Sequence, residues 1–231
     1  MRVVNKPTFS GYNSYIKNSE EEVEKLRKLL TVNVTRFKRD EEVWKILEKE
    51  VIPKLIEQKS DSIIKKLKFW SAGCATGEEP YSIAMTYLKN DPSSDINCSV
   101  TATDLDHEAL SFARNGEYPE KSLKNVTMSE KRKYFEEVED GYRVKNSLKE
   151  LVNFKRKDIF KTKFTQRFDL ILCRNLMIYF NNEAKTQLME RLVESLNKDG
   201  FLVIGMSENL REPAKSQVET YNLRRRIFVK H

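Results

Sequence analysis

The chain has 231 residues, enough for one sizeable core and a small appended domain. Hydrophobic residues make up 39% of it and charged residues 33%, which is typical of a globular protein with a heavily charged surface. The net charge of +7 favours an acidic partner, without choosing among nucleic acid, an anionic protein surface and a phosphate-bearing ligand. The chain has only two histidines, which argues against a histidine-based hydrolase and a histidine-ligated metal centre.

Cysteine usage and hydropathy bear on the compartment of the protein. The three cysteines, Cys74, Cys98 and Cys173, are widely spaced and indicate neither a disulfide framework nor a zinc site. No apolar run approaches the roughly 18 residues that a membrane-spanning helix needs, and the N-terminus lacks a secretory signal. We therefore expect a soluble, cytoplasmic protein without membrane insertion and without a bound metal.

Two helices are predicted near the N-terminus. Ser19–Leu30 begins with a capping serine and three glutamates, and its apolar residues fall on one face, whereas Met1–Asn18 shows no regular pattern. The second helix is expected from Asp40 to about Gln58, with a bend at Pro53.

The stretch Leu67–Ala84 has the pattern of a buried strand, a tight turn and the start of a helix. Gly73 and Gly77 lack the Cβ atoms that would keep a ligand away from the backbone, and Pro80 suits the first turn of a helix. The loop has neither the spacing of a Walker A motif nor a full dinucleotide fingerprint. By itself it is therefore as consistent with a tight turn as with ligand binding.

Strands and helices alternate in the segments that follow. A strand at Asn97–Thr103 is followed by a helix from Asp106, and further buried strands are expected at Leu151–Lys155, Phe168–Cys173 and Phe201–Gly205. This alternation predicts an α/β fold, a Rossmann-like and mainly parallel sheet with helices on both faces.

Two regions depart from the alternation. Residues 116–148 interrupt it and predict a small inserted β-subdomain, with a short helix at Ser129–Phe135 and an exposed strand at Gly141–Lys145. Near the C-terminus, the helix Asn182–Leu196 is expected to stop at Asp199-Gly200. The last residues are expected to form a closing hairpin or one long strand.

Polar residues stand where several predicted strands end. Asp104, Asp158 and the pair Arg174-Asn175 follow three different strands, and open α/β folds bind ligands at that edge of the sheet. Asp104 is placed to accept hydrogen bonds from ribose hydroxyls, although it is also consistent with an ordinary helix cap. Glu78 is better explained as a helix N-terminal charge than as a ligand contact.

At these residues the chain resembles the CheR family, the chemotaxis receptor glutamate O-methyltransferases. The resemblance implies the class I S-adenosylmethionine-dependent methyltransferase fold, S-adenosyl-L-methionine as methyl donor (S-adenosyl-L-homocysteine as product) and receptor glutamate carboxylates as acceptors. It implies a catalytic domain over residues 61–231, with the insertion at about 116–148, and a short helical N-terminal region over residues 1–60, truncated relative to the family. The matching segments, in chain order, are 30–40, 70–82, 102–106, 168–180 and 205–208.

The resemblance also assigns candidate site residues. Arg39 is expected to pair with a carboxylate and Tyr179 to orient the acceptor, unless Arg39 and Asp40 simply begin a helix and Tyr179 is a core residue. A glutamate acceptor, with an ordinary pKa of about 4.3, is ionised at pH 7 and needs no general base. The expected cofactor contacts, with Gly73 added from the loop pattern, are Asn33, Thr35, Arg39, Gly73, Glu79, Asp104, Asp158, Ile159, Arg174 and Asn175.

The expected partners are the cytoplasmic signalling domains of methyl-accepting chemotaxis receptors, and we expect a monomer that does not bind nucleic acid. Lys38 stands where the family usually has an aromatic residue, so the packing around Arg39 is expected to differ. The basic segment Arg143–Arg167 leaves a nucleic-acid methyltransferase open as an alternative. The short N-terminal region leaves open a non-catalytic, cofactor-binding receptor adaptor.

Overall fold

The computed structural model describes residues 8–19, 21–23, 25, 35–60, 62–92, 95–161 and 166–231. Its internal contacts divide the chain into two compact units, Met1–Val34 and Thr35–His231. Residues 35–60, grouped with the N-terminal region in the sequence-based division, therefore pack within the larger unit. Among the described residues, none of the helices has the length and apolar character needed to cross a membrane.

The smaller unit contains a helix that was not predicted, α1 (Phe9–Lys17). The Thr8 hydroxyl caps it by accepting from Gly11 N at 3.1 Å, and α1 buries no side chain. The expectation of irregular structure there was wrong, since Phe9, Tyr12 and Ile16 recur at the spacing of one helix face. The predicted cap at Ser19 is confirmed, since its hydroxyl accepts from Glu22 N at 3.2 Å. Most of the predicted helix Ser19–Leu30 lies outside the described residues.

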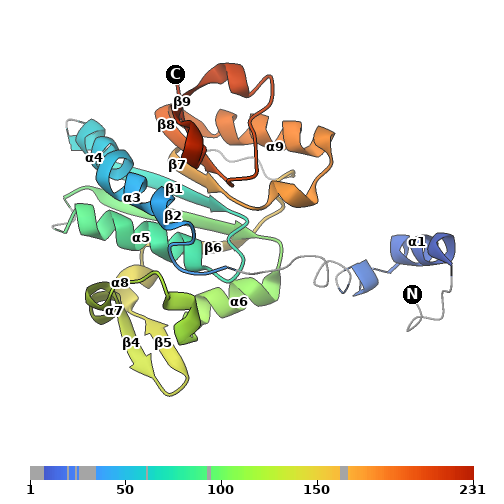
Figure 1. Cartoon of the computed structure of the whole chain (residues 1–231), viewed down its shortest axis with the longest axis horizontal. Helices are drawn as coiled ribbons and strands as arrows, with labels where there is room; N and C mark the ends of the chain where they lie inside the picture. The colour runs from blue at the N-terminus through green and yellow to red at the C-terminus, as the bar shows by residue number, and fades with distance from the viewer. Residues whose placement is uncertain are drawn as a thin grey trace. The chain divides into compact units, whose positions relative to one another are not determined.

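The larger unit is built on a seven-stranded sheet with the order β6-β2-β1-β7-β8-β10-β9 (Figure 1). The first five strands in this order run parallel, and β10 is antiparallel to both of its neighbours. This confirms the predicted α/β fold with a mostly parallel sheet, and the C-terminal pair is a hairpin. The strands are β1 (Lys66–Ala72), β2 (Asn97–Asp104), β6 (Val152–Arg156), β7 (Phe168–Cys173), β8 (Leu196–Ile204), β9 (Val218–Asn222) and β10 (Ile227–Lys230).

Two apolar cores cover the opposite faces of the sheet, because successive strand residues point to opposite sides. Phe69 belongs to the core that includes Trp44 and Tyr81, whereas Trp70 belongs to the core that includes Leu188. The first core is formed with α3, α4 and α5, and the second with α9. The helix α6 also contributes Leu110 to the first core. The bounds of these helices are α3 (Glu41–Ile46), α4 (Ile52–Ser60), α5 (Glu78–Asn90), α6 (His107–Asn115) and α9 (Asn182–Glu194).

A π-helical turn, η1 (Leu47–Val51), joins α3 to α4 immediately before Pro53. Proline has no N–H to donate, and its ring crowds the carbonyl four residues earlier, here that of Lys49. A turn with wider spacing gives the ring room, so the predicted helix continues through Pro53 to Ser60.

The insertion between α6 and β6 forms a three-stranded antiparallel sheet with the order β3-β5-β4. The predicted helix and the predicted strand are present as α7 and β5, whereas the two short strands that flank β5 were missed. The Thr127 hydroxyl and the Glu130 carboxylate cap α7 reciprocally. The elements are β3 (Glu117–Tyr118), η2 (Glu120–Leu123), α7 (Met128–Tyr134), β4 (Phe135–Val138), β5 (Gly141–Val144) and α8 (Asn146–Lys149).

The boundary between α9 and β8 differs from the prediction. The helix ends at Glu194, and Leu196 already pairs with Phe168 of β7, so Asp199-Gly200 lies within β8 and is no helix stop. A Cβ atom on Gly200 would lie 2.9 Å from the carbonyl oxygen of Asn197. Gly200 is therefore required by close backbone packing, which the sequence pattern does not distinguish from a helix end.

Candidate functional site

The ends of β1, β2 and β6 meet at one edge of the sheet. Ala72 lies opposite Thr103, and Asp104 lies opposite Arg156. Backbone hydrogen bonds continue beyond the strands, with Gly73 N donating to Thr103 O at 2.8 Å and Lys157 N donating to Asp104 O at 3.0 Å. This brings together the segments that carry Gly73, Asp104 and Asp158.

The loop between β1 and α5 carries Gly73 and Gly77, and we call it the glycine loop. Its conformation is set by the packing of the protein's own side chains. Gly73 and Gly77 have φ values of 77° and 94°, which suit glycine. A Cβ atom on Gly73 would lie 3.0 Å from a Leu176 methyl, and one on Gly77 would lie 2.7 Å from Ala113 Cβ and 2.9 Å from Tyr118 Oη. Side chains of the protein therefore occupy the clearance that the sequence suggested for a ligand, and a contact between Gly73 and the cofactor stays a prediction.

Asp104 is fixed at the tip of β2. Its two carboxylate oxygens accept from Ala75 N at 2.8 Å and from Asp106 N at 2.9 Å. The cap of α6 is Asp106, whose carboxylate accepts from Glu108 N and Ala109 N. The alternative that Asp104 is a helix cap is thus excluded. Each Asp104 oxygen keeps further acceptor capacity for a ligand hydroxyl.

Glu79 joins several predicted site residues. Its carboxylate accepts from Ser71 Oγ at 2.7 Å and lies 3.7 Å from Arg174 Nη1. Burial raises the pKa of Glu79 above its ordinary value, while the charge of Arg174, the Ser71 hydrogen bond and the charge of Arg39 act in the opposite direction. The two predicted arginines therefore act on one half-buried carboxylate. The neighbouring Glu78 is buried and accepts from Thr76 Oγ1 at 2.7 Å.

Arg174 also links this cluster to the start of α3. Its Nη2 donates to Asp40 Oδ2, and Asp40, at the N-cap position of α3, makes no side-chain cap. Arg39 and Asp40 therefore do more than begin a helix. Within the described part of the chain, Arg174 Nε is buried and has no hydrogen-bond partner. A buried donor of this kind is costly unless a partner satisfies it.

Glu208, which is 5% exposed, organises the turn after β7 and was missed as a site residue. Its carboxylate accepts from Gly205 N at 2.5 Å and Met177 N at 2.9 Å, and it also bonds the backbone of Asn175. Burial raises the pKa of Glu208, and these backbone hydrogen bonds oppose the rise. The sequence feature that could have identified Glu208 is its position three residues after Gly205, the glycine that follows a buried strand. The positive φ of Asn175, 59°, marks the turn that Glu208 holds.

Tyr179 ends a short 3₁₀ helix, η3 (Met177–Tyr179), and is 43% exposed. The alternative of a core residue is therefore excluded. Phe180 does pack inward, with its ring centroid 5.0 Å from that of Phe160. The exposed position leaves the Tyr179 ring available to an incoming substrate.

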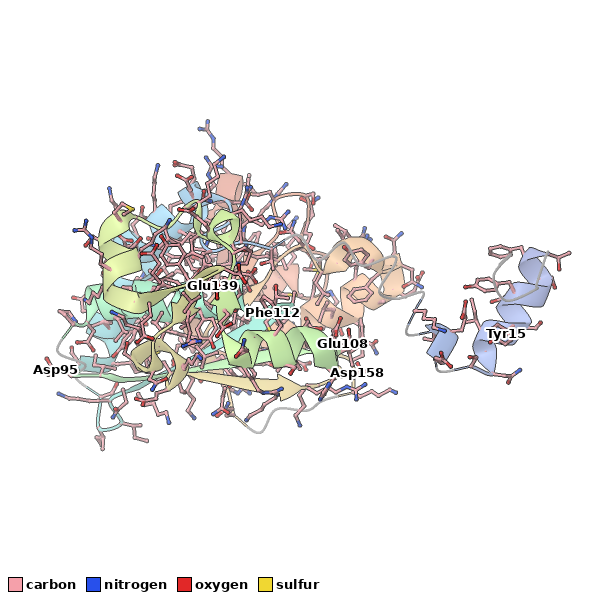
Figure 2. All side chains as sticks on the ribbon, turned by 90° about the horizontal axis from the view of Figure 1, so that it is seen from below. Tyr15, Asp95, Glu108, Phe112, Glu139 and Asp158 are labelled. Atoms are coloured by element: carbon pink, nitrogen blue, oxygen red, sulfur yellow. The ribbon has the colours of Figure 1, made fainter. Side chains whose placement is uncertain are left out.

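The remaining predicted contacts lie on two segments. Asp158, labelled in Figure 2, follows β6 and accepts from Phe160 N at 2.9 Å, and Ile159 O accepts from Arg191 Nε at 3.1 Å. Thr35 is half-buried at the start of the larger unit, and Asn33 lies outside the described residues.

Cations of the basic segment Arg143–Arg167 largely bond to nearby protein groups. Arg143 Nη2 lies 2.6 Å from Glu117 Oε1, and Lys149 Nζ donates to Asn115 O at 2.7 Å. Arg156 Nε donates to Leu105 O at 3.1 Å. These contacts are intramolecular, and they are what is expected of a solvent-exposed protein surface.

Comparisons with known proteins point to one family. The family model described as "CheR methyltransferase, SAM binding domain" matches residues 33–227. The chemotaxis protein methyltransferase of Listeria innocua is 34% identical over 215 residues, which is 93% of this chain and 80% of the relative. That of Borreliella burgdorferi is 35% identical over 210 residues, 88% of this chain and 74% of the relative.

Proposed function

Because the chain belongs to the CheR methyltransferase family, we propose that it methylates the side-chain carboxylates of glutamate residues on chemotaxis receptors, forming methyl esters. The family match and the named relatives make the chain an S-adenosylmethionine-dependent methyltransferase of chemotaxis. The glutamate acceptor, the receptor partner and the roles of individual residues are the proposal.

The observation that carries the proposal is the cluster of Arg39, Glu79 and Arg174 at the carboxyl edge of the sheet. It offers guanidinium groups and a half-buried carboxylate side by side, which complement the carboxylate and ammonium groups of an amino acid. S-adenosylmethionine carries both groups. The buried Arg174 Nε, without a partner among the described residues, supplies a donor that such a ligand would satisfy.

The other predicted contacts suit the nucleoside part of the cofactor. Asp104, held by two backbone amides, has acceptor capacity for the ribose hydroxyls. Asp158 and Ile159 lie one strand further along the edge, where we expect them to bond and pack against adenine. Asn33, Thr35, Gly73 and Asn175 complete the proposed set of contacts.

The acceptor side of the reaction needs positioning more than proton transfer. The bound cofactor supplies a methyl group on a positively charged sulfur, and a glutamate carboxylate is already ionised at neutral pH. The exposed Tyr179 ring is placed to orient the acceptor, and the Arg39 guanidinium to pair with a carboxylate. The receptor's signalling domain is cytoplasmic in this proposal, so the enzyme would act there.

A methylation assay on receptor signalling domains, with isotope-labelled S-adenosylmethionine, tests the proposal. We expect label on glutamate side chains, located by mass spectrometry and released by mild base, because methyl esters hydrolyse readily. Tyr179→Phe should retain cofactor affinity and lose turnover. Base-stable label, or label in nucleic acid and none in receptors, would contradict the proposal. A chain that binds the cofactor but transfers no methyl group would indicate a receptor adaptor.

A further inference from the structure

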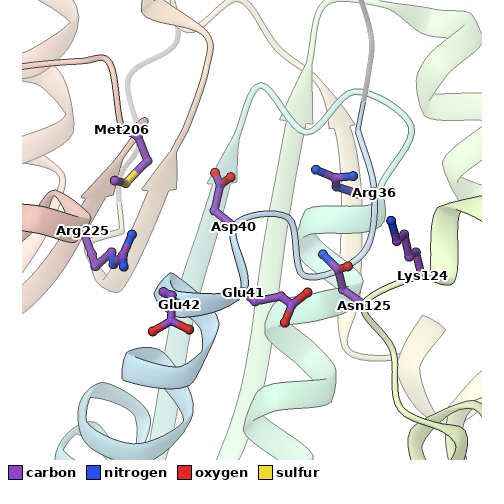
Figure 3. A pocket seen from close by; sticks show the side chains of 8 residues that line it. All are labelled: Arg36, Asp40, Glu41, Glu42, Lys124, Asn125, Met206 and Arg225. Carbon is purple, nitrogen blue, oxygen red and sulfur yellow. The ribbon is translucent and has the colours of Figure 1, made fainter.

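A pocket of about 540 Å³ opens beside Asp40, the residue that pairs with Arg174 (Figure 3). Its wall comes from three segments: the start of α3, the loop after η2 in the insertion, and the C-terminal part that follows β8. Figure 3 shows Arg36 and Lys124 on one side and Arg225 on the other, with Asp40 between them. Pockets of about 300–1,000 Å³ commonly hold ligands, so this one has room for a side chain and adjoining backbone.

The pocket is more positive than its composition suggests, because two of its carboxylates are already paired. Asp40 is bonded to Arg174, and Glu42 Oε1 lies 2.5 Å from Lys45 Nζ. Glu41 is the third carboxylate of the lining. Three lining cations, one from each segment, form no side-chain hydrogen bond or ion pair with the residues that the structure describes: Arg36, Lys124 and Arg225.

We propose that this pocket binds the anionic receptor segment that carries the acceptor glutamate, and that Arg36, Lys124 and Arg225 contact its carboxylates. This inference rests on the proposed function, since it takes the acceptor to be a glutamate side chain. Cations on several sides of a pocket attract an acidic segment and fix its orientation. Asp40 connects the pocket to Arg174, and therefore to the cluster assigned to the cofactor.

The reaction changes the charge that these cations recognise. A carboxylate oxygen forms a bond to the methyl carbon while the sulfur–carbon bond breaks, and the bonding pair of that bond stays on sulfur. No proton moves, and the acceptor loses its negative charge while the sulfur loses its positive charge. Arg36, Lys124 and Arg225 therefore favour the unmodified glutamate over the ester, which promotes release of the product.

Matched charge reversals in the full chain test the pocket. Lys124→Glu and Arg225→Glu change lining residues, whereas Lys121→Glu and Arg224→Glu change exposed neighbours outside the lining. Each lining variant should raise the KM for a receptor signalling domain about tenfold. Cofactor affinity by calorimetry and the unfolding temperature should match the controls. Added salt should raise the wild-type KM more than that of the lining variants.

The outcomes separate this inference from the proposed function. If the wild type methylates receptor glutamates and the lining variants have the KM values of their controls, the pocket is not the receptor site. The same holds if the charge-neutral variants Lys124→Gln and Arg225→Gln have the wild-type KM. If the wild type binds the cofactor but methylates no receptor glutamate, the proposed function and the pocket assignment fail together.

Discussion

Lys38 and Glu130 form a buried ion pair, with 2.5 Å between Nζ and Oε1, that joins the segment carrying Arg39 to the inserted subdomain. Both side chains are 9% exposed. The backbone of Lys38 is held as well, because its N–H donates to Ser82 Oγ at 3.0 Å and its carbonyl accepts from Asn125 Nδ2 at 3.0 Å. This chain thus uses a charged contact to join the segment that carries Arg39 to the insertion.

Breaking this pair should destabilise the protein strongly. Lys38→Met leaves the Glu130 carboxylate buried without its partner, and we expect the free energy of unfolding to fall by about 3 kcal/mol. The double variant with Glu130→Gln should recover part of the loss, because glutamine keeps the capping box but has no charge. Urea denaturation measures the three values. Additive effects of the two substitutions would show that the residues do not interact.

An exposed pair of the same length provides the control. Lys45 Nζ also lies 2.5 Å from Glu42 Oε1, but their side chains are 58% and 52% exposed. Lys45→Met should therefore change the free energy of unfolding by less than about 1 kcal/mol.

The buried pair also predicts a pH dependence. Burial pushes the pKa of Glu130 up, but the hydrogen bond and charge of Lys38 and the bonds from Thr127 hold it below its ordinary value. A lowered pKa in the folded state contributes stability above the unfolded pKa of about 4.3, and this contribution is lost as the pH falls through the folded value. The stability difference between wild type and Glu130→Gln should be constant from about pH 7 to 5 and shrink below about pH 4. A difference that grows in acid would contradict the assignment.

Substitutions at Asp104 and at Arg39 should affect cofactor binding and methyl transfer to different extents. Asp104→Ala removes the acceptor proposed for the ribose hydroxyls, and we expect cofactor affinity to fall about 100-fold or more. Arg39→Ala should mainly lower the rate of transfer, with a smaller loss of cofactor affinity than Asp104→Ala because Arg39 also belongs to the cluster proposed for the cofactor. Asp106→Ala, which removes the adjacent helix cap, should reduce stability and leave affinity unchanged. Equal affinity of wild type and Asp104→Ala in calorimetry would refute the proposed site.

Glu208 should stabilise the turn that carries Asn175 and Tyr179. Glutamine has one oxygen acceptor where the carboxylate has two, so Glu208→Gln turns an amide NH₂ toward backbone donors. We expect a loss of about 2 kcal/mol in the free energy of unfolding, together with a lower turnover. Glu212→Gln is the control, because Glu212 is exposed and its carboxylate accepts from Ser216 N at 3.2 Å on the surface of the protein. Wild-type turnover in Glu208→Gln would exclude the positioning role.

The sequence predicted what depends on local pattern. Asp104 was found because the predicted strand β2 ends at it, and the strand order then placed it beside the glycine loop. Glu208 was missed because its role depends on β7 and β8 being neighbours, which is a tertiary relationship. The pairing of Asp40 with Arg174 was missed for the same reason, since 134 positions separate the two residues. The side-chain partners of Lys38 likewise had no local signal.

The contact between the insertion and the glycine loop has a consequence for protein engineering. Tyr118 Oη donates to Thr76 O at 2.6 Å, and the same oxygen would lie 2.9 Å from a Cβ atom on residue 77. A chimera that exchanges the insertion alone would leave this contact unmatched and distort the loop. The glycine loop and the insertion should therefore be transplanted between homologues as one module.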